Sequence, residues 1–94
     1  MKNKVLWSEL AEETYLGILE YYQAFSQSAA ENLEAKVIAL TDRLAEFKYL
    51  CPPAPNLPRY RKCVIAQYTS VIYEVRGATI YITAFIVNRA DHLY

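Results

Sequence analysis

The four prolines of this 94-residue sequence lie close together, at Pro52, Pro53, Pro55 and Pro58. Proline has a fixed φ angle and no backbone N–H, so such a cluster is incompatible with a helix. The sequence therefore predicts that residues 49–58 form a semi-rigid surface loop without regular secondary structure. Pro52 and Pro55 also have the spacing of PxxP ligands, but in so compact a chain we interpret the segment as a connector.

The part before the prolines has a helical period. Residues 4–7 are apolar and predict one short strand. In residues 8–25 and 28–47, apolar or small side chains recur every three or four positions, as in helices that bury one face. The two series are Ala11, Tyr15, Ile18, Tyr22 and Phe25, then Ala30, Leu33, Val37, Leu40, Leu44 and Phe47. A coiled-coil dimer is the alternative, but runs this short are expected to pack on their own sheet.

Polar residues mark where these helices begin. Ser8 can cap the first helix, whereas Ser28 and Glu31 have the spacing of a capping box for the second. The break between the helices is only residues 26–27. A connection this short predicts an antiparallel helical hairpin.

After the prolines the pattern changes to strands. Residues 61–66, 69–75 and 79–87 are rich in β-branched and aromatic side chains. Residues 67–68 and 76–78 predict the two turns that join them. The expected fold is α+β: an N-terminal strand, an antiparallel helical hairpin and a three-stranded antiparallel meander, with the helices packed on one sheet face.

Length and charge limit the function. At 94 residues the chain is expected to be a single domain over residues 1–94. Its 10 basic and 10 acidic residues cancel, which by itself argues against a nucleic-acid partner. However, five basic and eight acidic residues precede Arg59, and five basic and two acidic residues lie from Arg59 onward. This segregation is typical of a site for an anionic partner, and a chance distribution is the alternative.

Location and cofactors follow from what the sequence lacks. No stretch is apolar enough for a membrane span or a signal peptide, so we expect a cytoplasmic protein with no membrane contact. Cys51 and Cys63 have neither CxxC spacing nor accompanying histidines, so we expect no metal and no other cofactor. Both thiols are expected to be reduced, with Cys63 a small core residue on a strand.

Candidate site residues concentrate in the last third of the chain. A sheet presenting several cations with a tyrosine and a histidine can hold a phosphodiester and transfer protons. RNA cleavage of this kind needs no metal, because the ribose 2′-hydroxyl is the nucleophile. The candidates are Arg59, Arg61, Lys62, Arg89, His92 and Tyr94.

Each candidate also has a structural interpretation. Arg59 and Arg61 can instead pair with helix carboxylates such as Glu46. His92 can be a solvated side chain, and Tyr94, as the terminal residue, can simply fray. Among the other tyrosines, those on the strands are expected to be half-buried.

Several short motifs along the chain carry a family resemblance. They are Val5-Leu6-Trp7-Ser8, Ser28-Ala29-Ala30, Arg61-Lys62-Cys63-Val64-Ile65, Tyr68, Val71-Ile72-Tyr73-Glu74-Val75, Ile80-Tyr81-Ile82 and Asn88-Arg89. In this order and spacing, over about residues 4–92, the chain resembles the RelE/ParE superfamily of type II toxin–antitoxin toxins, the plasmid stabilisation family.

The resemblance implies a small toxin that is neutralised by a cognate protein antitoxin. RelE-like members are metal-independent endoribonucleases (mRNA interferases) that cleave mRNA at the ribosome with basic residues and a late tyrosine or histidine. Carried over by position, the expected catalytic residues are Arg61, Arg89, His92 and Tyr94, and Lys48 is an expected RNA-binding residue. From the charge pattern, Arg59 and Lys62 are expected to bind RNA as well. This function requires Arg61 and Arg89 to lie near each other on a common face.

ParE-like members share the fold, lack that catalytic set and are thought to poison DNA gyrase by binding it. From the sequence alone we slightly favour the endoribonuclease, with gyrase inhibition as the alternative and a toxin that retains only antitoxin binding as a third. The exposed side of the helical hairpin, with Leu10, Leu19 and Tyr21, is the expected antitoxin surface. These exposed apolar residues can also be ordinary scattered surface residues or the contact surface of a homodimer. A heterotetramer with antitoxin is also compatible with the sequence.

Overall fold

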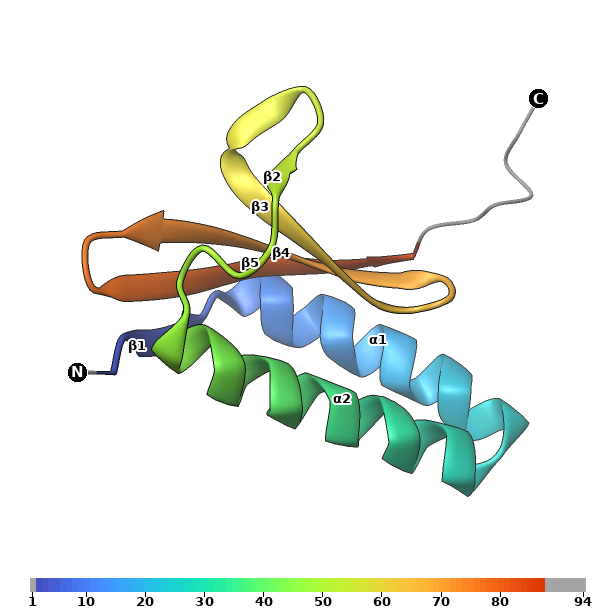
Figure 1. Ribbon diagram of the computed structural model, residues 1–94. Coiled ribbons are helices and arrows are strands. Elements are labelled where there is room, and N and C mark those ends of the chain that lie inside the picture. The colour runs from blue at the N-terminus through green and yellow to red at the C-terminus, as the bar shows by residue number, and fades with distance from the viewer. Residues whose placement is uncertain (1, 88–94) are drawn as a thin grey trace.

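Within residues 2–87, five strands form one mixed sheet, and two helices cover one of its faces (Figure 1). The computed structural model comprises residues 1–94, of which the structure describes residues 2–87. The elements are β1 (Lys4–Trp7), α1 (Glu9–Phe25), α2 (Gln27–Glu46), β2 (Pro53–Ala54), β3 (Leu57–Ala66), β4 (Thr69–Arg76) and β5 (Thr79–Val87). This α+β arrangement, with the helices on one sheet face, confirms the predicted fold class.

The two helices form the predicted hairpin, with a tighter junction than the sequence suggests. Ser8 Oγ accepts a hydrogen bond from the Ala11 N–H at 3.0 Å and caps α1 as expected. Ser26 ends α1 and caps α2 at once: its extended backbone turns the chain, and its Oγ accepts from the Ala29 N–H at 3.0 Å. The predicted capping box at Ser28 is therefore wrong. Within residues 2–87, neither helix is long and apolar enough to cross a membrane.

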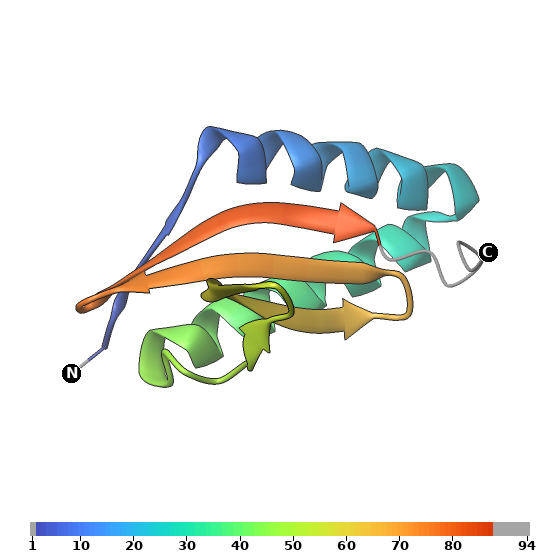
Figure 2. The same cartoon turned by 90° about the horizontal axis from the view of Figure 1, so that it is seen from above.

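The core lies between the helices and the sheet. Seen from above (Figure 2), α1 runs along β5 and α2 crosses beneath β3. The core residues are Ala11, Ile18, Leu33, Val37, Leu40, Leu44, Cys63, Val71, Tyr73, Ile80, Ile82 and Phe85. Both predicted helical stripes are confirmed except at their last members, Phe25 and Phe47, which are exposed because each lies at or beyond the end of its helix.

The strand order is β1-β5-β4-β3-β2, with β1 parallel to β5 and all other pairs antiparallel. The predicted meander is β3, β4 and β5, and Gly77 has the positive φ of 59° that its turn between β4 and β5 requires. The first strand thus lies beside the last one. As a result, the Ser8 N–H donates to the Ile82 carbonyl at 3.0 Å, which fixes the start of α1 against β5.

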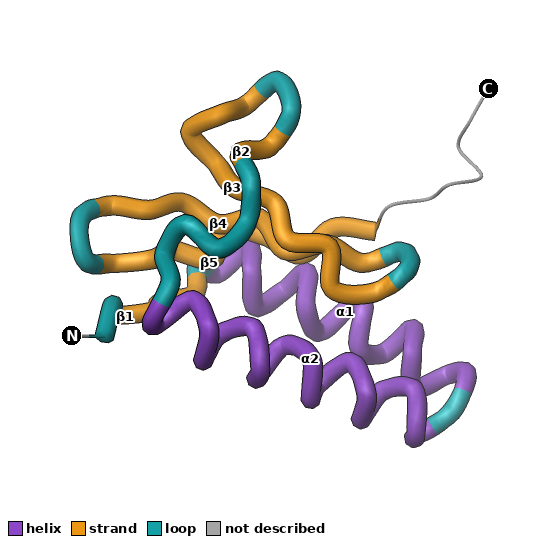
Figure 3. The backbone as a smooth tube through the Cα atoms, viewed as in Figure 1, coloured by secondary structure: helices purple, strands orange, loops and turns teal. Residues whose placement is uncertain are grey.

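The proline segment is more regular than predicted. β2 lies within it, and β3 begins at Leu57, so the expectation of no regular structure over residues 49–58 is wrong. Pro53 is opposite Arg61 and Ala54 is opposite Leu57, with Asn56 at φ 69° in the turn. Prolines are tolerated there because β2 is the edge strand of the sheet. The resulting β2–β3 hairpin projects away from the helices (Figure 3).

Candidate functional site

The described part of the predicted site is not a single cluster. Of the predicted site residues, Lys48, Arg59, Arg61 and Lys62 lie within residues 2–87, whereas Arg89, His92 and Tyr94 lie outside the described residues. The convergence of Arg61 with Arg89 therefore stays a prediction.

Arg61 and Lys62 lie on opposite faces of the sheet. In β3, Arg61 is opposite Tyr73 and Lys62 is opposite Ile72, and successive strand residues point to opposite faces. Arg61 lies on the face covered by the helices, because its partner Tyr73 belongs to the core. Lys62 lies on the open face and is half-buried, with no side-chain hydrogen bond or ion pair among the described residues.

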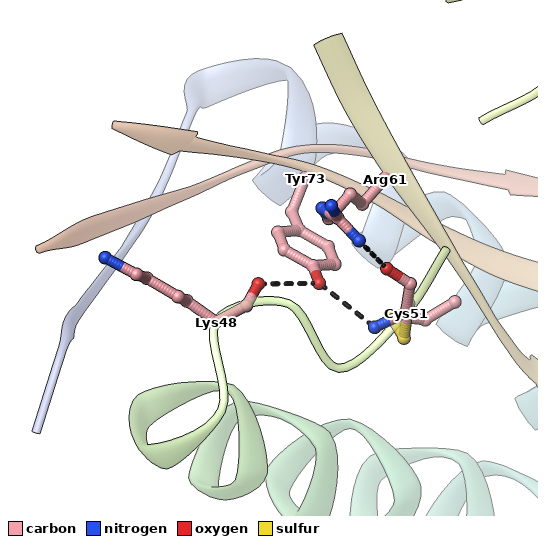
Figure 4. Close-up of a disulfide and its surroundings, with 5 residues drawn as sticks. Lys48, Cys51, Arg61 and Tyr73 are labelled. Atoms are coloured by element: carbon pink, nitrogen blue, oxygen red, sulfur yellow. Dashed lines mark hydrogen bonds between the residues drawn. A yellow bond between two sulfur atoms is a disulfide. The ribbon is translucent and has the colours of Figure 1, made fainter. Parts of the chain in front are cut away.

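The Arg61 guanidinium is held by the segment that follows α2. Its Nη1 donates to the Cys51 carbonyl oxygen at 2.5 Å (Figure 4). The centre of the guanidinium lies 4.8 Å from the centre of the Tyr49 ring. Both contacts come from the chain between α2 and β2. A carbonyl therefore uses one side of the guanidinium fork, and an aromatic ring covers one of its faces.

Tyr73 holds the same segment from inside the core. Its hydroxyl donates to the Lys48 carbonyl at 2.9 Å and accepts from the Cys51 N–H at 3.2 Å (Figure 4). Burial raises the pKa of this hydroxyl, while the Cys51 N–H and the Arg61 charge act in the opposite direction. The expectation of a half-buried strand tyrosine is wrong for Tyr73, which is fully buried and acts as a latch for residues 48–51.

A disulfide joins this segment to the sheet. Cys51 and Cys63 are bonded, with their Cα atoms 5.4 Å apart. The expectation of reduced thiols is therefore wrong, although Cys63 is the buried strand residue that was predicted. The pairing was missed because 12 positions separate the two cysteines in sequence, and only the β2–β3 hairpin brings them together.

A second cluster lies on the open face around Glu74. Arg59 Nη2 and Arg76 Nη2 contact its two carboxylate oxygens at 2.9 and 3.1 Å. These hydrogen bonds, that of Arg59 foremost, hold the pKa of Glu74 below its usual value. The guanidinium of Arg59 also stacks over Tyr60, and that of Arg76 over Tyr81, each at 5.0 Å.

The proposed pairing of Arg59 and Arg61 with Glu46 is wrong, because Arg59 pairs with Glu74 and Arg61 with a carbonyl. Sequence reasoning also missed Glu74 and Arg76 as members of an ion-pair cluster. Their spacing of two residues in a strand, which puts both on one face, was the available signal. Lys48 is tied down as well: its Nζ donates to the Gly77 carbonyl at 3.0 Å.

A groove of about 670 Å³ lies between α1 and the end of β5. Aromatic and apolar side chains line it: Ile18, Tyr21, Tyr22, Tyr68, Phe85 and Val87. Of the predicted antitoxin surface, Leu10 and Tyr21 are exposed, whereas Leu19 packs against the core. At the groove the Phe85 N–H donates to Thr14 Oγ1 at 2.9 Å, beyond the point where β1 stops pairing with β5.

Residues 5–92 match the family model of the ParE toxin of the type II toxin–antitoxin system parDE. The chain belongs to this ParE toxin family. The match confirms the resemblance that the sequence motifs suggested. Comparison with curated protein sequences finds no match.

Solved structures share the fold of this ParE-family toxin. The chromosomal ParDE system from P. aeruginosa aligns with a TM-score of 0.76 at 15% identity, covering 94% of this chain and 98% of that one. A YoeB/ParE toxin from Agrobacterium tumefaciens aligns at 0.66 and 14%, covering 92% of this chain and 99% of the other. YafQ from E. coli strain BL21(DE3) aligns with a TM-score of 0.65 at 10% identity, covering 97% of this chain and 99% of that one. Likeness at such identities is a likeness of fold.

The geometry of this ParE-family toxin limits its chemistry. Within residues 2–87, most cations of the last third already have partners inside the molecule: Arg59 and Arg76 with Glu74, and Arg61 with Cys51. The same residues contain no cluster of three or more potential metal ligands. The arginine and tyrosine side chains of the described part are of the types that are enriched in protein interfaces.

Proposed function

We propose that this toxin acts in the ParE-like way, by binding DNA gyrase and blocking its reaction cycle without cutting RNA. The observation that supports this function best is the internal pairing of Arg59, Arg61 and Arg76. Acid–base cleavage of RNA needs cations that are available to a phosphorane and groups that exchange protons near neutral pH. Here each guanidinium already has a carboxylate or a carbonyl as a partner, which competes with a phosphate for it.

Electrostatics support the same function. The formal net charge of zero gives no strong attraction to ribosomal RNA, whose binding rests on many phosphate contacts. The tyrosines that flank Glu74 across the strands, Tyr60 and Tyr81, offer the side chains that are enriched in protein interfaces. Gyrase is a cytoplasmic enzyme, so the proposal also places the toxin in the cytoplasm.

The antitoxin partner is part of this proposal. A solved relative is the DinJ–YafQ toxin–antitoxin complex from E. coli. We propose that the cognate antitoxin of this chain covers the groove between α1 and β5 with an apolar segment that folds on binding. The assembly can be a heterodimer or a heterotetramer, and sedimentation of the purified complex distinguishes the two.

The test of the toxin's target has two arms run on the same preparation. Purified toxin is mixed with DNA gyrase and plasmid, and separately with ribosomes translating a reporter mRNA. We expect loss of supercoiling and accumulation of gyrase-linked DNA breaks, with intact mRNA. Cleaved mRNA together with normal supercoiling would refute gyrase inhibition.

The endoribonuclease remains a second candidate because of Lys62. Lys62 lies on the open face. It is opposite Ile72 of β4, which is in turn opposite Ala84 of β5, and β5 ends three residues later at Val87. Arg89, His92 and Tyr94, the predicted catalytic residues, follow in the sequence. If the toxin cleaves RNA, Lys62→Ala should reduce cleavage at least about tenfold, since it removes a charge-assisted phosphate contact. Lys36→Ala, an exposed lysine of α2, is the matched control.

A further inference from the structure

The β2–β3 hairpin (residues 52–62) is closed at its base by the disulfide. The ring between Cys51 and Cys63 contains β2, the turn at Asn56 and the first part of β3. It also contains three of the five basic residues that begin at Arg59, namely Arg59, Arg61 and Lys62. Whether this disulfide is oxidised or reduced therefore affects how these three basic side chains are held.

Apolar packing contributes little to this hairpin. It projects from the body of the protein (Figure 3), and of its residues only Ala54 is buried. Leu57 is exposed. Its base is held by the pairing of residues 60–62 with β4 and by polar contacts: the Lys62 N–H donates to the Pro52 carbonyl at 3.1 Å, and Arg61 donates to the Cys51 carbonyl.

These contacts all depend on the position of one segment, residues 48–52. The acceptors on Cys51 and Pro52, and the Cys51 N–H that reaches Tyr73, all lie in the segment of residues 48–52. The disulfide is the covalent link between that segment and β3. Without it, the segment is held by the packing of Leu50 and Cys51 against the core and by hydrogen bonds that are each weak in net terms.

We propose that Cys51 and Cys63 form a reversible thiol–disulfide lock, and that its reduction releases residues 48–52, the β2–β3 hairpin and the Arg61 guanidinium. An external thiolate attacks one sulfur, forming a mixed disulfide and expelling the other sulfur as a thiolate, which takes a proton. A second external thiol then resolves the mixed disulfide. The net reaction converts two thiols to one external disulfide and delivers two electrons and two protons to the cysteine pair.

Accessibility and compartment support reversibility. Cys63 is buried, whereas Cys51 is half-buried in a surface segment, so we take Cys51 Sγ as the sulfur that a small thiol attacks. If the proposed gyrase target is right, the toxin works where small thiols keep most cysteines reduced, and disulfides in that compartment are usually transient. The oxidised toxin then presents a fixed hairpin, whereas the reduced toxin must order it on binding.

The lock itself is tested on the full chain by backbone ¹⁵N relaxation in the oxidised and the reduced protein. The sequence has no other cysteine, so the reductant acts on this bond alone. On reduction we expect order parameters of residues 48–51, 54, 56–57 and 59, which have a backbone N–H and are not paired with β4, to fall from about 0.85 to below about 0.6, with β4 and β5 unchanged. Cys51→Ser should give the reduced pattern with and without reductant.

Three results would overturn the lock: unchanged order parameters on reduction, loss of the whole fold on reduction, or a bond that stays oxidised in a large excess of reduced glutathione. If Cys51→Ser fails to fold, the reduced wild-type protein still gives the comparison.

The functional consequence is tested separately in the gyrase assay and rests on the proposed function. We expect the reduced toxin and Cys51→Ser to inhibit gyrase about tenfold more weakly than the oxidised toxin, because preorganisation is lost. Equal inhibition by all forms would refute the regulatory role. If no form inhibits gyrase, the proposed gyrase target is refuted. The relaxation experiment then still decides whether the disulfide acts as a lock.

Discussion

The two hairpins of this toxin are held in place by different physical means. The helical hairpin, α1 and α2, inserts a row of buried side chains into the core, among them Leu33 and Leu44. The β2–β3 hairpin buries almost nothing and depends on strand pairing, one disulfide and a few hydrogen bonds around Cys51. Apolar packing does not depend on redox state or pH. A disulfide, by contrast, is broken by reduction, and a polar contact of an ionisable group is weakened by a change of pH. The β2–β3 hairpin is thus the part of the molecule that conditions can change.

Removing packing from the helical hairpin should have the largest effect. Leu44→Ala deletes a fully buried side chain and should lower the free energy of unfolding by about 3–5 kcal/mol. Ile38→Ala on the same helix removes an exposed side chain and should cost less than about 0.5 kcal/mol. Urea denaturation measures both. A cost below about 1 kcal/mol for Leu44→Ala would contradict the packing argument.

Reduction of the disulfide should come second. Opening a loop with a sequence separation of 12 should lower the free energy of unfolding by about 3 kcal/mol, through the entropy of the unfolded chain. Tm should then fall by about 10–20 °C in scanning calorimetry with reductant. The double variant Cys51→Ser/Cys63→Ser should show no response to reductant. A reductant-independent Tm in the wild type would contradict this prediction.

The Tyr73 latch ranks third. Tyr73→Phe keeps the ring in the core but removes the partner of the Cys51 N–H and of the Lys48 carbonyl, so it should cost about 1–3 kcal/mol. Tyr81→Phe is the control, because that hydroxyl has no hydrogen bond within residues 2–87. The cost of Tyr73→Phe should shrink in reduced protein, since the segment it holds is already released. Equal costs in both redox states would mean that the disulfide and the latch act independently.

The junction of the helical hairpin offers a smaller test. Ser26→Ala removes the side-chain acceptor of the Ala29 N–H and should lower the free energy of unfolding by about 1 kcal/mol. Ser28→Ala should leave it unchanged within about 0.5 kcal/mol. A larger cost for Ser28→Ala than for Ser26→Ala would contradict this assignment and support the capping box expected from the sequence.

The Glu74 cluster should give the smallest effect. Because Arg59 lowers the pKa of Glu74 in the folded state, this group adds stability above its unfolded value of 4.5, and the gain is lost as pH falls through the folded pKa. Glu74→Gln should lower Tm by less than about 5 °C at pH 7, because exposed ion pairs are weak. The difference from wild type should shrink as pH falls through the lowered pKa of Glu74. Glu46→Gln, without an ion pair among the described residues, is the control, and a pH-independent difference would point to a cause other than charge.

Much of the fold could be predicted because its causes are local. Apolar spacing of three and four residues fixes which side of a helix is buried, and β-branched runs mark strands, so both helices and all three meander strands are confirmed. The failures came where context overrides propensity. Pro53 and Pro58 lie in strands because β2 and the start of β3 form the sheet edge, where a missing N–H costs little.

The candidate site was less predictable, since it depends on what each side chain meets. Arg59 and Arg61 are both basic residues of β3, yet one pairs with Glu74 on β4 and the other with a carbonyl after α2. Neither partner is close in sequence: the separations are 15 and 10 residues. Nothing in local composition distinguishes an available arginine from an engaged one.

By itself, the sequence determined the two helical stripes, the strand-rich last third and the family, because periodicity and the order of motifs are properties of the chain. Only the tertiary structure decided that β1 lies beside β5, that Cys51 meets Cys63, and that Arg61 faces inward while Lys62 faces outward. The physical reason is that strand pairing brings together residues far apart in the chain, and those long-range contacts determine which polar groups are satisfied within the protein and which remain for a partner.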